Sequence, residues 1–126
     1  MSFSSDGNTI AIGASENDAN GQASGCVRVY NYTGSSWVKL GQDINGESVS
    51  DRSGGSVSIS ADGNIVAIGA KWNNGNGTSS GHVRIYEFNG TSWNQLGQDI
   101  DGEAAYDWSG CSVSISNDGN KVAIGA

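Results

Sequence analysis

The chain has 126 residues, about the size of one domain, with 20 glycines, no proline and a formal net charge of −7. Only six residues are Lys or Arg and they form no cluster, so we expect binding neither to nucleic acid nor to anionic membranes. No apolar run approaches the about 20 residues of a membrane span, so no membrane insertion is expected either.

The chain repeats itself with a constant period of 56 residues. Asp6-Gly7-Asn8 recurs as Asp62-Gly63-Asn64 and again as Asp118-Gly119-Asn120, and Trp37 maps onto Trp93 at the same shift (62 − 6 = 118 − 62 = 56). About half of the aligned positions are identical. A period of this length indicates propellers, solenoids or arrays. We therefore divide the chain into unit 1 (1–56), unit 2 (57–112) and the first hairpin of a third unit (113–126).

Each unit is predicted to contain four short strands. Alternating Val, Ile and small polar residues favour strands over helices, and no window carries apolar residues at helical spacing. The Asp-Gly-Asn segments have the composition of tight hairpin turns, since Asp and Asn tolerate positive φ and Gly adopts it freely. In unit 2 the predicted strands are 57–60, 65–70, 82–88 and 93–100, the last preceded by a turn at Gly90-Thr91.

Four short strands joined by tight turns, with apolar residues on both faces, are typical of a β-propeller blade between two neighbouring blades. The predicted fold class is therefore all-β, with two propeller blades and one hairpin per chain. Because a propeller needs about 4–8 blades to close, we expect the chain to self-associate. Two, three or four copies would give rings of four, six or eight blades, and three copies are favoured.

Two longer connections in each unit are predicted to lie at the same end of the blades. They are 15–25 and 45–55 in unit 1, and 71–81 and 101–111 in unit 2. Binding residues favour loops on a rigid scaffold, so this end is the expected ligand face.

Two tryptophans in these loops are not required by the repeat. Trp72 and Trp108 occupy the positions of Glu16 and Arg52, so they are candidates for stacking on a sugar or packing against a partner protein. Burial in a blade or against another chain is the alternative. Asn73 and Tyr106, from the same loops, complete the candidate ligand-contact set: Trp72, Asn73, Tyr106 and Trp108.

No residue pattern supports catalysis or metal binding. We find no nucleophile elbow, phosphate loop or zinc-ligand spacing, and His82 is the only histidine. Cys26 and Cys111 occupy different repeat positions and are expected to be free thiols. The loop residue Asp51 is expected to accept backbone N–H bonds rather than to act as a ligand or an acid. No catalytic, cofactor-binding or metal-binding residue is predicted.

The repeat resembles the FG-GAP repeat of integrin-type β-propellers. The similar segments are Asp107-Trp108-Ser109-Gly110, the Ile68-Gly69-Ala70 that ends the second strand, and the third strand Gly81-His82-Val83-Arg84-Ile85-Tyr86. The resemblance implies a β-propeller and an extracellular or cell-surface location. It does not extend to the family's calcium loops, because one carboxylate in each Asp-Gly-Asn turn cannot supply the 6–8 oxygens that calcium needs.

The favoured function is a non-enzymatic repeat module that binds a protein or a glycan through its long loops. A purely structural repeat, or an excised or engineered self-assembling propeller fragment, is the alternative. A hydrolase with carboxylates in a central channel is the most remote possibility, since propellers host many chemistries.

Overall fold

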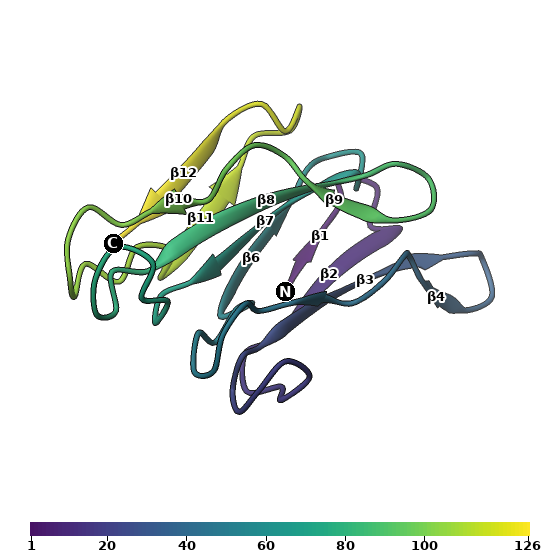
Figure 1. The fold of residues 1–126 in the computed structure, drawn as a ribbon. Helices are drawn as coiled ribbons and strands as arrows, with labels where there is room; N and C mark the ends of the chain where they lie inside the picture. The colour runs from purple at the N-terminus through teal and green to yellow at the C-terminus, as the bar shows by residue number, and fades with distance from the viewer.

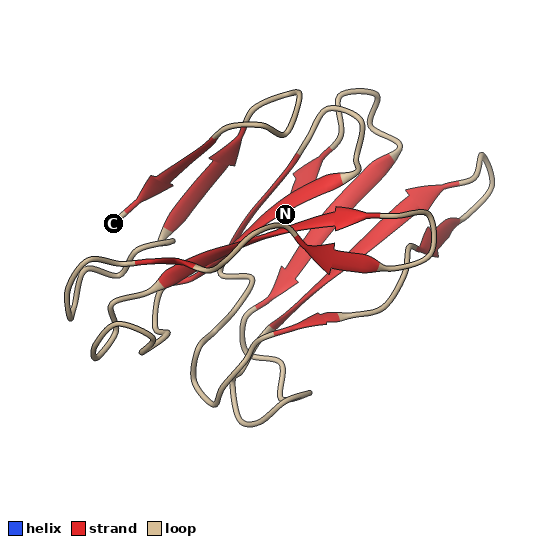
Figure 2. Ribbon diagram, turned by 45° about the horizontal axis from the view of Figure 1, so that its top comes forward, coloured by secondary structure: helices blue, strands red, loops and turns tan.

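The computed structural model describes residues 1–126 and confirms that the chain is all-β, with twelve strands and no helix (Figures 1 and 2). No helix is therefore available to cross a membrane. The first sheet contains β1 (Ser2–Phe3), β2 (Thr9–Ala14), β3 (Cys26–Tyr32), β4 (Trp37–Lys39) and β5 (Ile44–Asn45). The second sheet contains β6 (Ser56–Ile59), β7 (Ile65–Ala70), β8 (His82–Phe88), β9 (Trp93–Gln95) and β10 (Ile100–Asp101). β11 (Ser112–Ile115) and β12 (Val122–Gly125) form the C-terminal hairpin.

The three sheets lie side by side, and the axes of their strands are roughly aligned from one sheet to the next (Figure 2). All strand pairs within the sheets are antiparallel, and β1 and β2 contact β6 while β11 contacts β6 and β7. The long loops gather at one end of the molecule, at the lower left of Figure 1, and the tight turns lie at the other end.

The Asp-Gly-Asn segments are the tight turns that the sequence predicts. The Asp6 carboxylate accepts the backbone N–H of Asn8 at 2.9 Å, and the corresponding distance is 3.0 Å for Asp62 and Asn64. Gly63 has a φ of +78°, which glycine adopts without strain. These carboxylates are therefore occupied by their own turns.

The fourth strand is not continuous, contrary to the prediction for 93–100. Between the pairs Tyr86↔Gln95 and Val83↔Ile100, β8 has two residues whereas the opposite segment has four, 96–99. The extra residues bulge out of the ladder around Gly97, whose φ is +69°. The fourth strand is thus split into β9 and β10, and unit 1 is split in the same way into β4 and β5.

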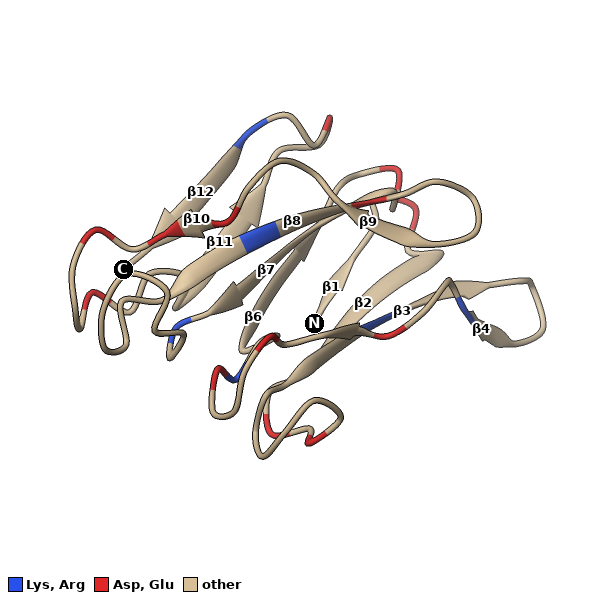
Figure 3. Ribbon diagram, in the orientation of Figure 1, with Lys and Arg blue, Asp and Glu red and all other residues tan.

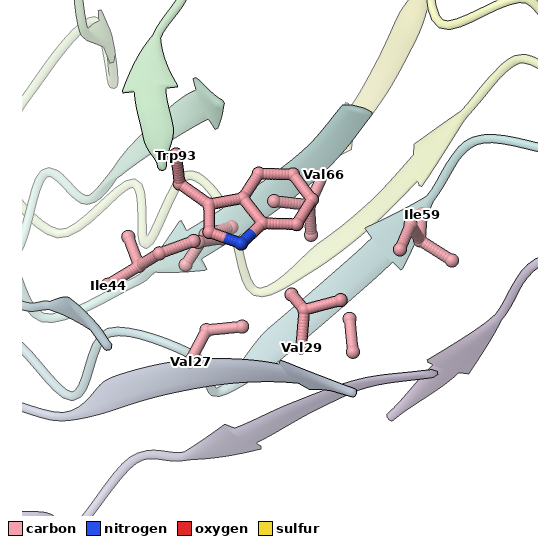
Figure 4. Close-up of a cluster of buried hydrophobic side chains, with 8 residues drawn as sticks. Val27, Val29, Ile44, Ile59, Val66 and Trp93 are labelled. Atoms are coloured by element: carbon pink, nitrogen blue, oxygen red, sulfur yellow. The ribbon is translucent and has the colours of Figure 1, made fainter. Parts of the chain in front are cut away.

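The main core lies between the first and second sheets, which contribute four buried side chains each (Figure 4). Alternation along the strands directs these side chains to one face of each sheet. Trp93 has the largest side chain of the cluster, and its indole N–H donates to the Leu40 carbonyl at 2.9 Å. The first sheet provides Ala11, Val27, Val29 and Ile44, and the second provides Ile59, Val66, Ile68 and Trp93.

The opposite side of the first sheet carries the same kinds of side chain, and Phe3, Ile12 and Trp37 among them are exposed. We call the side chains of Phe3, Ile10, Ile12, Tyr30 and Trp37 the outer face; together they line an apolar groove of about 360 Å³. Trp37 is 46% exposed whereas its repeat equivalent Trp93 is 3% exposed, and Ile12 is 39% exposed against 1% for Ile68. The outer face of the first sheet is therefore the repeat equivalent of the face of the second sheet that is buried against the first sheet.

The same hydrogen bonds join each sheet to the next. The Ser2 hydroxyl accepts the backbone N–H of Ile59 at 3.1 Å, and the Ser58 hydroxyl accepts that of Ile115 at 3.0 Å. At the turn end, Ser5 donates to Ala61 and Ala61 donates to Asn117, both at 3.0 Å. The second boundary therefore repeats the bonding of the first at a shift of 56 residues.

Candidate functional site

The long loops of both units have the same backbone conformation. Arg52 and Trp108, at equivalent positions, both have positive φ values (53° and 55°), as do Ser50 and Tyr106 (67° each). Positive φ is uncommon for residues other than glycine and often marks functional sites. Here the positive φ values recur at equivalent positions of both units although the side chains differ. They are therefore a property of the loop conformation and not of a particular side chain.

The structure brings two of the predicted ligand-contact residues together. The rings of Trp72 and Trp108 lie 6.0 Å apart and are tilted by 51°, in the range of favourable aromatic pairs. The Arg52 guanidinium and the Lys71 ammonium lie 5.8 and 5.7 Å from the centre of the Trp72 ring. Tyr106 is 66% exposed in the same loop as Trp108. Trp72, Trp108 and Tyr106 thus share the long-loop end of the second sheet.

Trp72 also lines two cavities between the loops, of about 220 and 330 Å³, and Arg52 lines both with it. Its indole nitrogen is buried without a hydrogen-bond partner. In unit 1 the equivalent positions of Trp72 and Trp108 hold an ion pair, Glu16 with Arg52 at 3.1 Å. The aromatic pair of unit 2 therefore occupies the positions that an ion pair occupies in unit 1.

Asn73 directly follows Trp72 but is only 5% exposed, and its side chain bonds to Asp51 rather than to the aromatic residues. Its side-chain amide donates to Asp51 at 2.9 Å, and the same carboxylate oxygen accepts the backbone N–H of Ser48 at 3.0 Å. These bonds confirm the loop-fixing role predicted for Asp51. Asp107 has the same role in unit 2, where it accepts the backbone N–H of Ala104 at 2.8 Å.

A polar cavity of about 430 Å³ lies between the first sheet's long loop and the second sheet, and no hydrophobic residue lines it. Four carboxylates line it, those of Glu47, Asp51, Asp99 and Asp101. Figure 3 shows acidic segments on β10 and just before it, near the one basic segment of β8. That segment contains Arg84, whose Nη1 lies 3.3 Å from Glu47 and whose Nη2 donates to the Asn45 carbonyl at 3.0 Å.

His82 lies against this acidic group with a side chain that is 2% exposed. Its Nδ1 is 3.7 Å from Asp99 Oδ2 and 3.8 Å from Asp101 Oδ1. Burial, and next the charge of Arg84, lower the pKa of His82 below its usual 6.5. The imidazole is therefore held in its neutral form, with a ring nitrogen facing two carboxylates.

Sequence reasoning missed this group because its members come from separate segments. Atoms of Glu47, His82 and Asp99 that can bind a metal all lie within 4.8 Å of one another, although Glu47 belongs to unit 1. A comparison of repeat positions would have been informative, since His82 and Asp101 replace Cys26 and Asn45 of unit 1. The two cysteines are both free, as predicted: Cys26 is buried and Cys111 is exposed.

No protein-family model matches the chain, and no curated protein shows a significant similarity to it.

Proposed function

We propose that the chain is a non-catalytic interaction module of β-propeller type that assembles with further copies of itself. Each five-stranded sheet would be one blade with an interrupted fourth strand. The observation that carries the proposal is the exposed outer face, which repeats the face of the second sheet that is buried against the first sheet. An apolar groove of this kind marks an interaction surface.

The buried contacts of Trp93 describe what the exposed Trp37 would meet on a second copy. The Trp93 indole donates to Leu40, and its backbone N–H and carbonyl bond to the Gln42 side chain at 3.0 and 2.8 Å. The equivalents of Leu40 and Gln42 in unit 2 are Leu96 and Gln98. Leu96 is 40% exposed, so its side of the second sheet has room for an incoming tryptophan.

The far side of the second sheet offers the matching apolar surface. Ile85, Leu96, Ile115 and Val122 line a cavity of about 240 Å³ between this sheet and the C-terminal hairpin. Ile100 is 39% exposed there, whereas its equivalent Ile44 is 4% exposed in the core. An outer face of a second copy would cover these side chains as the second sheet covers Val29 and Ile44.

The two terminal hairpins compete for one place in such an assembly. The C-terminal hairpin packs on the second sheet in the position that β1 and β2 of an incoming copy would need. One of them must be displaced or exchanged between copies, as in domain swapping. Chains contributing two blades each would then close rings of four, six or eight blades, and we favour three copies.

Light scattering coupled to size-exclusion chromatography at micromolar concentration tests the proposal. We expect a discrete oligomer, with three copies as the favoured stoichiometry. Deleting residues 113–126 removes the redundant hairpin and should leave the oligomer intact, since β1 and β2 can occupy its place. A cooperatively folded monomer at these concentrations would overturn the assembly.

The aromatic pair of the long loops favours a second candidate function, binding of a glycan or of a protein partner at this end. Trp72 and Trp108 replace an ion pair of unit 1, and Tyr106 extends the apolar surface beside them. A glycan array followed by tryptophan-fluorescence titration of the hits tests this candidate. Trp108→Arg restores the unit 1 residue and should abolish binding; unchanged binding would exclude the aromatic pair as the contact.

A further inference from the structure

We propose that Glu47, His82 and Asp99, with Asp101 as a further oxygen ligand, form a binding site for a divalent transition-metal ion of the zinc type. The site would join the two sheets, because Glu47 follows β5 of the first sheet while the other three ligands belong to the second. It lies outside the aromatic pair and outside the outer face, so it does not depend on the function proposed above.

The geometry is close to that of a metal centre. A zinc ion with ligand bonds of about 2.0–2.2 Å brings its ligand atoms to roughly 3.5 Å from one another. The binding atoms of Glu47, His82 and Asp99 lie within 4.8 Å of one another, and Asp101 Oδ1 is 3.8 Å from the same imidazole nitrogen. Side-chain rotation can close the remaining gap, since the side chains of Glu47 and Asp99 are 42% and 32% exposed.

The unpartnered imidazole is the second observation that points to a ligand. A buried polar group without a hydrogen bond costs free energy, and such groups are rare in native structures. The side chain of His82 is only 2% exposed, yet its Nδ1 lies 3.7 and 3.8 Å from the carboxylate oxygens of Asp99 and Asp101, beyond hydrogen-bond distance. A metal ion bound at Nδ1 would satisfy this nitrogen.

The local charge also favours a cation. Four carboxylates, those of Glu47, Asp51, Asp99 and Asp101, are offset here only by Arg84, which leaves an excess of three negative charges. Arg84 contacts one oxygen of the Glu47 carboxylate. The other oxygen is free to bind an ion.

Unit 1 shows what the same positions look like without these features. His82, Gln95 and Asp101 replace Cys26, Lys39 and Asn45. In unit 1, Lys39 and Arg28 bind Asp43, the equivalent of Asp99, at 2.7 and 2.9 Å. Unit 2 has therefore gained the imidazole of His82 and the carboxylate of Asp101, and it has lost the lysine that would compete for Asp99. One imidazole with carboxylates suits zinc and similar transition metals better than calcium or magnesium.

Isothermal titration of zinc into the tag-free, chelator-treated protein tests the site, in a Cys111→Ser background that removes the exposed thiol. We expect one ion per chain. Affinity should fall at least tenfold in His82→Asn, Glu47→Gln and Asp99→Asn. If His82→Asn fails to fold, Glu47→Gln decides the test, since this side chain is partly exposed. Retained affinity in the folded variants would overturn the proposal.

Two matched variants and one spectroscopic signal complete the experiment. Glu103→Gln and Asp43→Asn change the repeat equivalents of Glu47 and Asp99 outside the site, and both should bind zinc as the parent does. Because His82 is the only histidine, its imidazole nitrogen signals in NMR report on the site directly. Zinc should shift these signals at one equivalent. Zinc binding that leaves them unchanged, or that is lost in Glu103→Gln, would contradict the assignment.

Discussion

Replacing Trp37 by alanine should weaken self-association far more than it destabilises the single chain. Its equivalent Trp93 is 3% exposed and donates a hydrogen bond from its indole, so Trp93→Ala should cost about 3–5 kcal/mol of folding free energy. Trp37 is 46% exposed, so about half of that value is expected for Trp37→Ala in the isolated chain, roughly 1.5–2.5 kcal/mol.

Between copies, Trp37 would become a buried aromatic anchor at the centre of the contact. Truncating such an anchor costs about 2 kcal/mol or more, which raises the dissociation constant roughly 30-fold. Sedimentation velocity over a concentration series measures this dissociation constant. Urea unfolding, at a concentration where the parent and the variant are both monomeric, measures the change in folding free energy.

Val38→Asn is the matched control. Val38 follows Trp37 on β4, lies on the opposite face and has Asn as its equivalent in unit 2, so this variant should associate as the parent does. If Trp37→Ala associates as tightly as the parent, or if Val38→Asn weakens association equally, the outer face is not the contact.

Three further substitutions test a close backbone approach at β7, the long loop and a tight turn. Gly69→Ala should cost about 1–3 kcal/mol in urea unfolding, because its Cβ would overlap the Gly110 carbonyl oxygen. Trp108→Arg should change the unfolding free energy by no more than about 0.5 kcal/mol, since the same loop holds arginine in unit 1. The Ser60 hydroxyl and then a backbone amide lower the pKa of Asp62 below 3.8, so its stabilisation is present above that pH and is lost as pH falls through the lowered value. Asp62→Ala should therefore be less stable than the parent near neutral pH, and the difference in urea midpoint should shrink below pH 3.8.

Local features of the fold were predictable because they depend on short segments. The second and third strands of unit 2, residues 65–70 and 82–88, have the predicted bounds, and the Asp-Gly-Asn turns form as expected. The split fourth strand was not predictable from alternation alone, since 93–100 contains apolar residues at both ends. Its bulge depends on the register against β8, which the sequence does not specify.

The candidate sites were predictable only where a single residue broke the repeat. Trp72 and Trp108 differ from their equivalents and do lie together, whereas Asn73 proves to be a buried partner of Asp51. The group around His82 depends on contacts between units, and spacing along one unit cannot reveal it. Each polar substitution that creates this group, taken alone, does not indicate a binding site.

The recurrence of the same hydrogen bonds at both sheet boundaries bears on how such a gene can evolve. Because each unit meets its neighbour through bonds like that from Ile59 to Ser2, repeated from Ile115 to Ser58, duplication of a 56-residue segment supplies both sides of a new boundary at once. Unequal recombination can therefore lengthen or shorten the array in whole units without any new contact having to arise by point mutation. Selection then acts separately on exposed positions within each copy, which allows one unit to diverge, as unit 2 does around His82, while the shared framework stays constant.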